Sequence, residues 1–384
     1  MDNETSNECT LIDENGVPVV YAKTCATFPE EVLYSITKLA DLNRISTLIS
    51  QTCHGVIGTH GRTVELVFQP HIQKGLKDGS LKMMQTRSGE TLADTIHVGG
   101  KSAGKIAGKG RIIEGGKLKQ IATGSFQVIS LIVAQAHLAE IDKNLADIKT
   151  SVQKIYQSLE DTHLAKIEGR IHYLENIIDK MRRGDFDYEV SLQIKNKIED
   201  TVADAYEWQA ILFSRVKSLT ASAGALQNSD TFGTGDTFQK LKGIAEEINP
   251  LIQRRNILLT LAALLAYIQA CIDPTNKEFS QLDLQRVYWE SLLITFAQTV
   301  GQKSKTLLSQ AKFNSQEMLD HRRFFIDTTL DSAQKMAEYS HAHYESSLLK
   351  LRNNHRQILT ENGKLRLAVT HDERGEIIKA AVVD

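Results

Sequence analysis

The twelve histidines are the residues of this sequence best suited to bind a metal ion or to move protons. His341 and His343 lie two positions apart in a predicted helix, so their side chains point about 200° apart and cannot chelate one ion unaided. The sequence has no H-E-x-x-H, no G-x-S-x-G and no cysteine–histidine signature. We therefore expect no metal site and no catalytic residue, and interpret the histidines as polar positions on long helices with occasional core positions.

Phosphate binding is the second chemistry that the sequence suggests. The stretch GGKSAGKIAGKGRIIEGG, residues 99–116, contains seven glycines, and Gly99, Gly104 and Lys105 match most of the G-x-x-x-x-G-K-[ST] pattern. Position 106 is isoleucine, so the hydroxyl that would hold Mg²⁺ is missing, and more glycines follow where a phosphate-capping helix should begin. We predict no cofactor, and interpret the segment as a basic connector.

A cluster of basic residues near the C-terminal end could form a patch for acidic lipid or nucleic acid. The same predicted helix carries several aspartates and glutamates, and such mixed signs are typical of a solvated face. The whole chain has a formal net charge of −2, which makes nucleic acid an unlikely partner. The basic residues concerned are Arg322, Arg323, Arg352, His355 and Arg356.

The cysteines and the N-terminus indicate a cellular compartment. Cys9, Cys25, Cys53 and Cys271 form no C-x-x-C unit, which favours free thiols in a reducing compartment. The N-terminal MDNETSNECT is acidic and polar, whereas a secretory signal has a basic start and then an apolar run. We expect a cytoplasmic protein, with peripheral membrane attachment and export without a cleaved signal as open alternatives.

A heptad repeat dominates the middle of the chain. From Leu131 to Leu159 the apolar positions follow steps of three and four residues without an error, which predicts a long helix whose seam lies against a partner helix. The repeat resumes at Leu164, so the step from Leu159 is either a break in phase or a turn between two antiparallel helices. The seam that we predict consists of Leu131, Leu138, Ile141, Leu145, Ile148, Val152, Ile155 and Leu159.

The most apolar run is ILLTLAALLAYIQACI, from Ile257 to Ile272. As a helix it would extend roughly 24 Å, short of the ~30 Å hydrocarbon core, so a single permanent membrane span is not expected. The run is either a core helix enclosed by the others or a sequestered segment that inserts into a membrane on a trigger. Its candidate membrane-facing residues are Ile257, Leu261, Leu264, Leu265, Ile268 and Ile272.

These elements predict a mainly α protein: an elongated bundle of long antiparallel helices with a small α/β element at the N-terminus and a C-terminal β-hairpin. Only Pro250 and Pro274 lie beyond residue 70, which favours helix over most of that length. In the α/β element we expect a strand from Val17 with Pro18 at a sheet edge, and a helix from Pro29 to Ser50. The predicted units are 1–98 (α/β element), 99–123 (Gly/Lys-rich connector), 124–362 (long-helix bundle) and 363–384 (hairpin).

Several helix limits follow from local signals. We expect Asp236 and Gln239 to form a capping box, Pro250 to kink the helix that follows, and Asp273-Pro274 to end the apolar helix. If fully helical, residues 281–362 would reach roughly 120 Å, and their core face is weakest between Gly301 and Met318, where we expect a bend or break to cost least.

The stretch from Leu81 through Gly116 into the heptad helix resembles a group of uncharacterised bacterial proteins. The resemblance rests on LKMMQTRSG, followed by the helix opening FQVISLIVAQAHLAEIDKNL, and covers about a fifth of the chain. The group has no family name, and the resemblance implies a bacterial source but no activity.

Three functional hypotheses follow. The first is a non-enzymatic helical assembly protein of a bacterial cell, defence- or toxin-like, which acts as an oligomer or with a protein partner and contacts a membrane through the apolar helix. The second is a soluble coiled-coil scaffold or sensor that binds a partner protein. The third is an enzyme with an unrecognised site.

Overall fold

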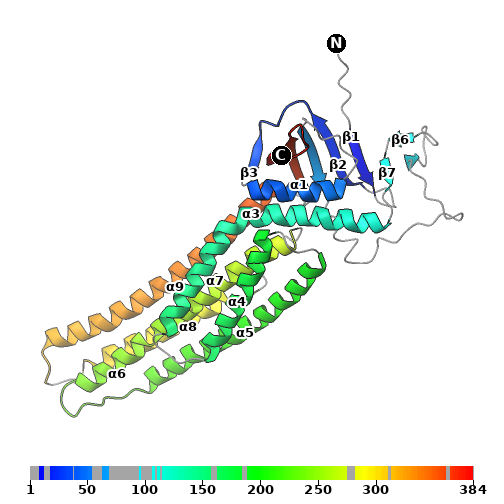
Figure 1. Ribbon diagram of the computed structural model, residues 1–384. Coiled ribbons are helices and arrows are strands. Elements are labelled where there is room, and N and C mark those ends of the chain that lie inside the picture. The colour runs from blue at the N-terminus through cyan, green and yellow to red at the C-terminus, as the bar shows by residue number, and fades with distance from the viewer. Residues whose placement is uncertain are drawn as a thin grey trace.

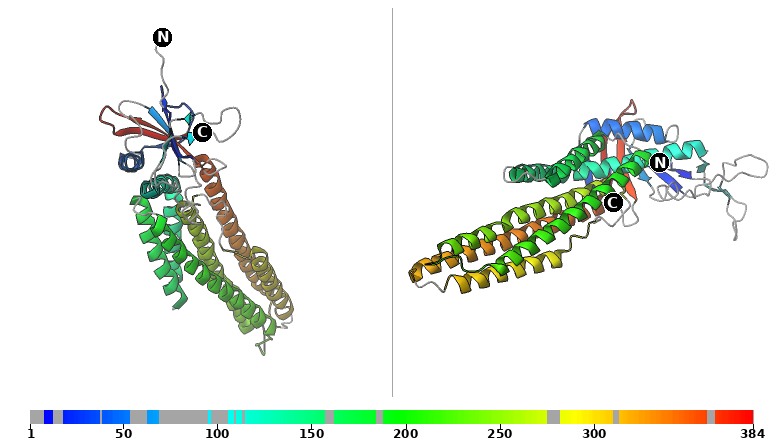
Figure 2. Two further views of the ribbon diagram at one scale, coloured as in Figure 1. Left: turned by 90° about the vertical axis from the view of Figure 1, so that its right-hand side faces the viewer. Right: turned by 90° about the horizontal axis from the view of Figure 1, so that it is seen from below.

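The structure is a computed structural model, and it is mainly α, as the sequence predicts. An elongated helical bundle extends from a smaller part that contains the sheet (Figure 1), and both views of Figure 2 show the sheet at one end of the bundle. The described residues are 8–12, 18–37, 39–53, 63–68, 95–96, 106–108, 110–112, 115–156, 162–183, 188–274, 282–309, 313–359 and 364–383.

The sheet joins the two ends of the chain. Its strand order is β3-β9-β8-β4-β2-β1-β7, so the C-terminal hairpin β8–β9 lies between the N-terminal strands β3 and β4. β5 and β6 form a separate two-stranded pair. The strands are β1 (Glu8–Ile12), β2 (Pro18–Cys25), β3 (Val32–Ile36), β4 (Thr63–Phe68), β5 (Thr95–Ile96), β6 (Ile106–Gly108), β7 (Gly110–Ile112), β8 (Leu365–His371) and β9 (Ile377–Val383).

Alternating apolar residues bury one face of this sheet. Leu365, Leu367 and Val369 of β8 are fully buried in the same core as Val64 and Leu66 of the neighbouring β4. In Figure 1, α1 (Leu39–Cys53) and the first half of α3 (Gly115–Tyr156) run side by side along the sheet, and α1 contacts both α3 and β9. Between the apolar positions lie polar cross-strand pairs such as Arg366–Glu65, whose Nε–Oε1 distance is 2.9 Å.

All of the bundle is inserted between β7 and β8. It continues from α3 through α4 (Thr162–Arg183), α5 (Tyr188–Ala225), α6 (Gly235–Glu246), α7 (Ile248–Ile272) and α8 (Arg286–Leu307) to α9 (Gln316–Ile358). Because α3 leaves the sheet and α9 returns to it, the bundle is an arm with both of its chain connections at one end (Figure 1).

Ion pairs give the direction of α4. Arg182 pairs with Asp142, and Lys149, seven residues further along α3, pairs with Glu175, seven residues back along α4. The two helices are therefore antiparallel, and the five-residue step in the heptad pattern corresponds to the connection between them. Other contacts show that α7 and α9 run parallel: Tyr267 donates to the carbonyl of Ser347, and Pro274 accepts from His355.

The predictions for the N-terminal part are partly wrong. Residues from Pro29 to Ser50 do not form one helix, because Val32–Ile36 pairs with β9 as a strand and the helix begins at Leu39. Pairing with a C-terminal strand is a non-local interaction that helical periodicity cannot report. Likewise, β2 with Pro18 is not at an edge, because it lies between β1 and β4.

Helix limits also differ from the sequence prediction. α3 begins at Gly115, inside the predicted connector 99–123, of which residues 99–105, 109 and 113–114 lie outside the described residues. The span 281–362 forms two helices, α8 and α9, and the separation between Leu307 and Gln316 agrees with the break expected between Gly301 and Met318. Pro250 lies in the first turn of α7 instead of kinking a longer helix.

α6 is capped differently from the prediction. Its N-cap is Thr234, whose side chain makes no capping bond, so the predicted box of Asp236 and Gln239 is wrong. The carboxylate of Asp230 accepts from the backbone N–H groups of Asp236 and Thr237 instead, each at 2.9 Å. A loop residue thus supplies the acceptor that the helix start requires.

Candidate functional site

Helix α7 is enclosed by the rest of the bundle. All residues from Ile257 to Ile272 are buried, and α7 contacts α3, α5 and α9. Among the described residues, one helical stretch, 235–272, is long and apolar enough to cross a membrane, and 89% of its most apolar window is buried. The candidate membrane residues Ile257, Leu261, Leu264, Leu265, Ile268 and Ile272 are thus core residues in this structure.

The predicted seam lies mostly inside the bundle. Leu131, Ile141, Ile148 and Val152 are buried, whereas Leu138 and Leu145 are half-buried. Leu159 and the side chain of Ile155 lie outside the described residues. The structure therefore brings together the first part of the seam, the buried residues of α4 and the enclosed helix α7.

Polar side chains interrupt the apolar packing around α7. His137 of α3 lies edge-on to Tyr267 at a ring-centroid distance of 5.3 Å and stacks on His355 of α9 at 6.4 Å. Among the described residues, neither ring nitrogen of His137 and neither amide atom of Gln269 has a hydrogen-bond partner. A buried polar group without a hydrogen-bond partner destabilises a fold by about 1–3 kcal/mol. These side chains therefore contribute less to the stability of the core than the apolar residues around them.

Burial keeps these groups neutral. Desolvation, with a smaller contribution from His355, lowers the pKa of His137 to about 3. Desolvation also lowers the pKa of His355 and raises the pKa of Tyr267 to about 12. The thiol of Cys271 has a raised pKa for the same reason, so it is an inert core residue and no nucleophile.

Arg255 of α7 is a buried cation next to the start of α8. Its Nη1 donates to Oε1 of Gln209 at 2.7 Å, and its Nη2 donates to the carbonyl of Leu284. The guanidinium also lies over the rings of Phe213 and Trp289, at 5.8 and 5.4 Å from the centroids. Desolvation lowers its pKa to about 10, so Arg255 stays charged at neutral pH and fixes the chain that leads into α8.

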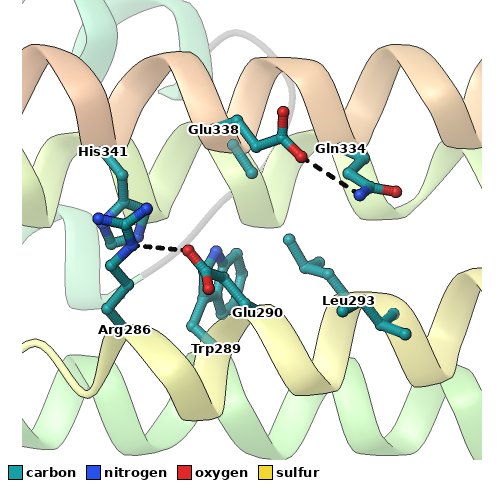
Figure 3. A pocket seen from close by; sticks show the side chains of 9 residues that line it. Arg286, Trp289, Glu290, Leu293, Gln334, Glu338 and His341 are labelled. Atoms are coloured by element: carbon teal, nitrogen blue, oxygen red, sulfur yellow. Dashed lines mark hydrogen bonds and ion pairs between the residues drawn. The ribbon is translucent and has the colours of Figure 1, made fainter.

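A pocket of about 280 Å³ lies between α8 and α9. Figure 3 shows Arg286 and Glu290 of α8, with Gln334, Glu338 and His341 of α9, extending into the space between the two helices. Arg286 pairs with Glu290, with an Nε–Oε1 distance of 2.6 Å, and also with Glu345. Trp289, Leu293, Ile294 and Ala337 supply its apolar lining.

The pocket has one histidine in its lining. His341 lines the pocket, and desolvation together with the charges of Arg255 and Arg286 lowers its pKa to about 4. No serine, threonine or cysteine lines this pocket. Within the part of the chain that the structure describes, no three His, Cys, Asp or Glu side chains group so that they could hold a metal ion.

Reasoning from the sequence missed His137, Arg255 and the pocket. Arg255 is one of two arginines just before the apolar run, but the sequence does not show that Arg255 is buried whereas Arg254 is half-buried. His137 carries no such signal, since it neighbours the seam position Leu138. The pocket depends on the packing of α8 against α9, and a bend or break expected between Gly301 and Met318 does not indicate which faces of the two segments meet.

Comparisons with known proteins give no match: no family model, no curated protein and no solved structure is significantly similar to this chain.

Proposed function

We propose that this protein is a non-enzymatic helical protein that acts by binding a partner protein at the far end of its bundle. We call this end the distal tip; it comprises the loop 226–234, Phe313 and the start of α9. One observation carries the proposal: Phe232 and Phe313 come from different connections and touch edge-to-face at 5.4 Å, yet are 74% and 71% exposed.

The distal tip has the composition of an interface core. Phe232, Phe313 and the exposed Met318 are of the residue types enriched where proteins bind each other. The charges nearby are mixed, because Glu317 and Asp320 accompany Arg323, which pairs with Asp320. An anionic membrane surface would favour an excess of lysine and arginine, so the mixed charges favour a protein partner.

Hydrogen bonds hold this surface in place. The buried hydroxyl of Thr234 accepts from Nδ2 of Asn314 at 2.8 Å and from Arg322, which ties the loop 226–234 to the start of α9. Gly233 has a φ of +82°, a conformation that favours glycine. A surface that is ordered before binding loses less conformational entropy when a partner docks, which favours affinity.

Site-specific photocrosslinking in cells tests this proposal. With p-benzoylphenylalanine in place of Phe313, we expect one discrete covalent product, and the same probe in place of Tyr339, which is equally exposed on the middle of α9, should give none. Phe232→Ser should abolish the product without lowering the melting temperature measurably, because Phe232 is exposed. A product whose mass is twice that of the chain would identify a second copy as the partner.

Equal crosslinking at positions 313 and 339, or a product that persists in Phe232→Ser, would contradict the proposal.

A second candidate function is membrane insertion of α7. The observation in its favour is the continuous apolar run from Ile257 to Ile272, and the observation against it is the burial of that run inside the bundle. Insertion would require the bundle to open, and Arg254 and Arg255 limit how far the apolar segment extends.

Liposome flotation distinguishes the two candidates. If α7 stays buried in the bundle, the protein should remain at the bottom of the density gradient. We expect this result with neutral and with anionic vesicles, and at neutral and at acidic pH. Flotation that coincides with protease accessibility around α7 would favour insertion instead.

A further inference from the structure

Helix α8 has an exposed stripe of residues on the side that faces away from the bundle. The residues of this stripe follow steps of four and three, so they lie along one side of the helix, opposite the buried Trp289, Phe296 and Val300. Val287 is 81% exposed and Ile294 is 46% exposed, so both of its apolar side chains are in contact with solvent. We call it the α8 stripe; it consists of Val287, Ser291, Ile294, Gln298, Gly301 and Lys305.

The middle of the α8 stripe is uncharged and has open space beside it. α8 carries no charged residue from Ser291 to Gln302, whereas helix faces that only meet solvent usually carry charges. A Cβ atom added to Gly301 would meet no heavy atom within 4 Å, so the backbone of another helix can approach closely at this turn. Depletion of charge together with exposed apolar side chains is typical of the core of a protein interface. The stripe is therefore a candidate surface for packing against another helix.

The two ends of the stripe differ in charge. At the N-terminal end of α8, Arg286 pairs with Glu290 and Glu345. Glu338 extends into the same space (Figure 3), so three carboxylates lie around one guanidinium. At the C-terminal end, Lys305 is exposed and forms no ion pair with any residue that the structure describes. Roughly 28 Å of helix separates the two ends, which is more than two Debye lengths, so their charges do not neutralise each other.

We infer that the α8 stripe packs against the same stripe of a second copy of this chain, with the two helices antiparallel. The antiparallel direction places Lys305 of each copy beside the carboxylates at the N-terminal end of the other, whereas a parallel pair would bring like charges together. In the register that aligns the two stripes, Ile294 lies opposite Gln298, and Ser291 lies opposite Gly301. Each copy presents the same surface, so the contact closes as a two-fold dimer.

This dimer contact is separate from partner binding at the distal tip, because the α8 stripe and the distal tip share no residue. One helix face is a small interface, of the class that forms weak or transient complexes. We therefore expect a dissociation constant between about 1 and 100 μM for the dimer.

Sedimentation velocity of the full chain at concentrations from about 1 to 200 μM tests the inference. We expect the monomer to convert into a dimer over this range, and added salt to weaken the dimer, because the contacts at both ends are ionic. Ile294→Asp places an unpaired charge in the middle of the stripe and should weaken the dimer at least about tenfold. Ile294 is exposed in the single chain, so this variant should melt as the wild type does.

Lys305→Glu tests the direction of the two helices. In the antiparallel dimer it replaces an attractive contact with a repulsive one, so the dimer should weaken about fivefold or more. The response to salt should also reverse, because added salt now screens a repulsion.

Tyr339→Asp is the matched control, because Tyr339 is 73% exposed but lies on the opposite side of α9 from the residues that face α8. It should leave the dimer unchanged, as should Phe232→Ser at the distal tip. A chain that stays monomeric at about 200 μM would overturn the inference. Unchanged affinity in Ile294→Asp or in Lys305→Glu, or a dimer that Phe232→Ser removes, would overturn it as well.

Discussion

A chain that ends at Leu359 should fail to form the sheet, although the deleted residues 360–384 are a small fraction of the protein. The deletion removes β8 and β9, which lie between β3 and β4. It takes Leu365, Leu367, Val369, Ile377 and Val382 out of the core. Burial of five such side chains contributes about 10 kcal/mol, which is comparable to the whole stability of a typical domain.

Hydrogen exchange measures this effect. In the truncated chain, the amides of β2 and β4 should exchange as in unfolded peptides, while much of the helical circular dichroism remains. Ile378→Thr in the full-length chain is the control, because Ile378 belongs to the same hairpin but is exposed, and it should leave exchange unchanged. Adding the hairpin back as a separate peptide should restore protection. Full protection of β4 in the truncated chain would show that the hairpin does not hold the sheet together.

Acidification should destabilise the folded protein well above the pH at which carboxylates titrate. The pKa values of His137 and His341 are about 3 and about 4 in the folded chain. In the unfolded chain both are about 6.5. Below about pH 6.5 the unfolded chain therefore binds more protons than the folded one, and the free energy of unfolding falls by about 1.4 kcal/mol per pH unit for each histidine.

At about pH 5 these two histidines together should have reduced the free energy of unfolding by about 4 kcal/mol. Above about pH 6.5 both are neutral in both states, so their effect is absent there. The lowered pKa of His355 adds to the loss in the same direction. Urea unfolding at a series of pH values measures this slope.

His137→Phe should remove about 2 kcal/mol of the loss at about pH 5, because an apolar ring of similar size replaces the buried imidazole. His321→Gln is the matched control: His321 is exposed on α9, so the slope should be unchanged. A free energy of unfolding that stays constant from neutral pH to about pH 5 would show that the buried histidines are accessible to protons in the folded chain.

The helical part of the fold was predictable from local patterns. Steps of three and four residues from Leu131 onward, the scarcity of proline and the Asp273-Pro274 stop all act within one or two helical turns, and the structure contains the corresponding helices. The C-terminal hairpin was equally predictable, because two alternating runs flank the turn at Asp372–Gly375. In each case the signal is a short-range periodicity that does not depend on which other segment packs against it.

The sites were not predictable in this way. The distal tip exists because the loop 226–234 meets Phe313 from a connection about eighty residues away, and the pocket exists because α8 and α9 are separate helices that pack against each other.

By itself, the sequence determined a mainly α chain with a seam, an apolar helix and a terminal hairpin, because residue type and spacing fix which local hydrogen bonds form and which faces are apolar. Only the tertiary structure decided that the hairpin enters the sheet between β3 and β4, that α7 lies enclosed, and that His137 and Arg255 are buried. These features depend on contacts between segments far apart in the chain, where an apolar face identifies a surface to be buried but not the segment that covers it.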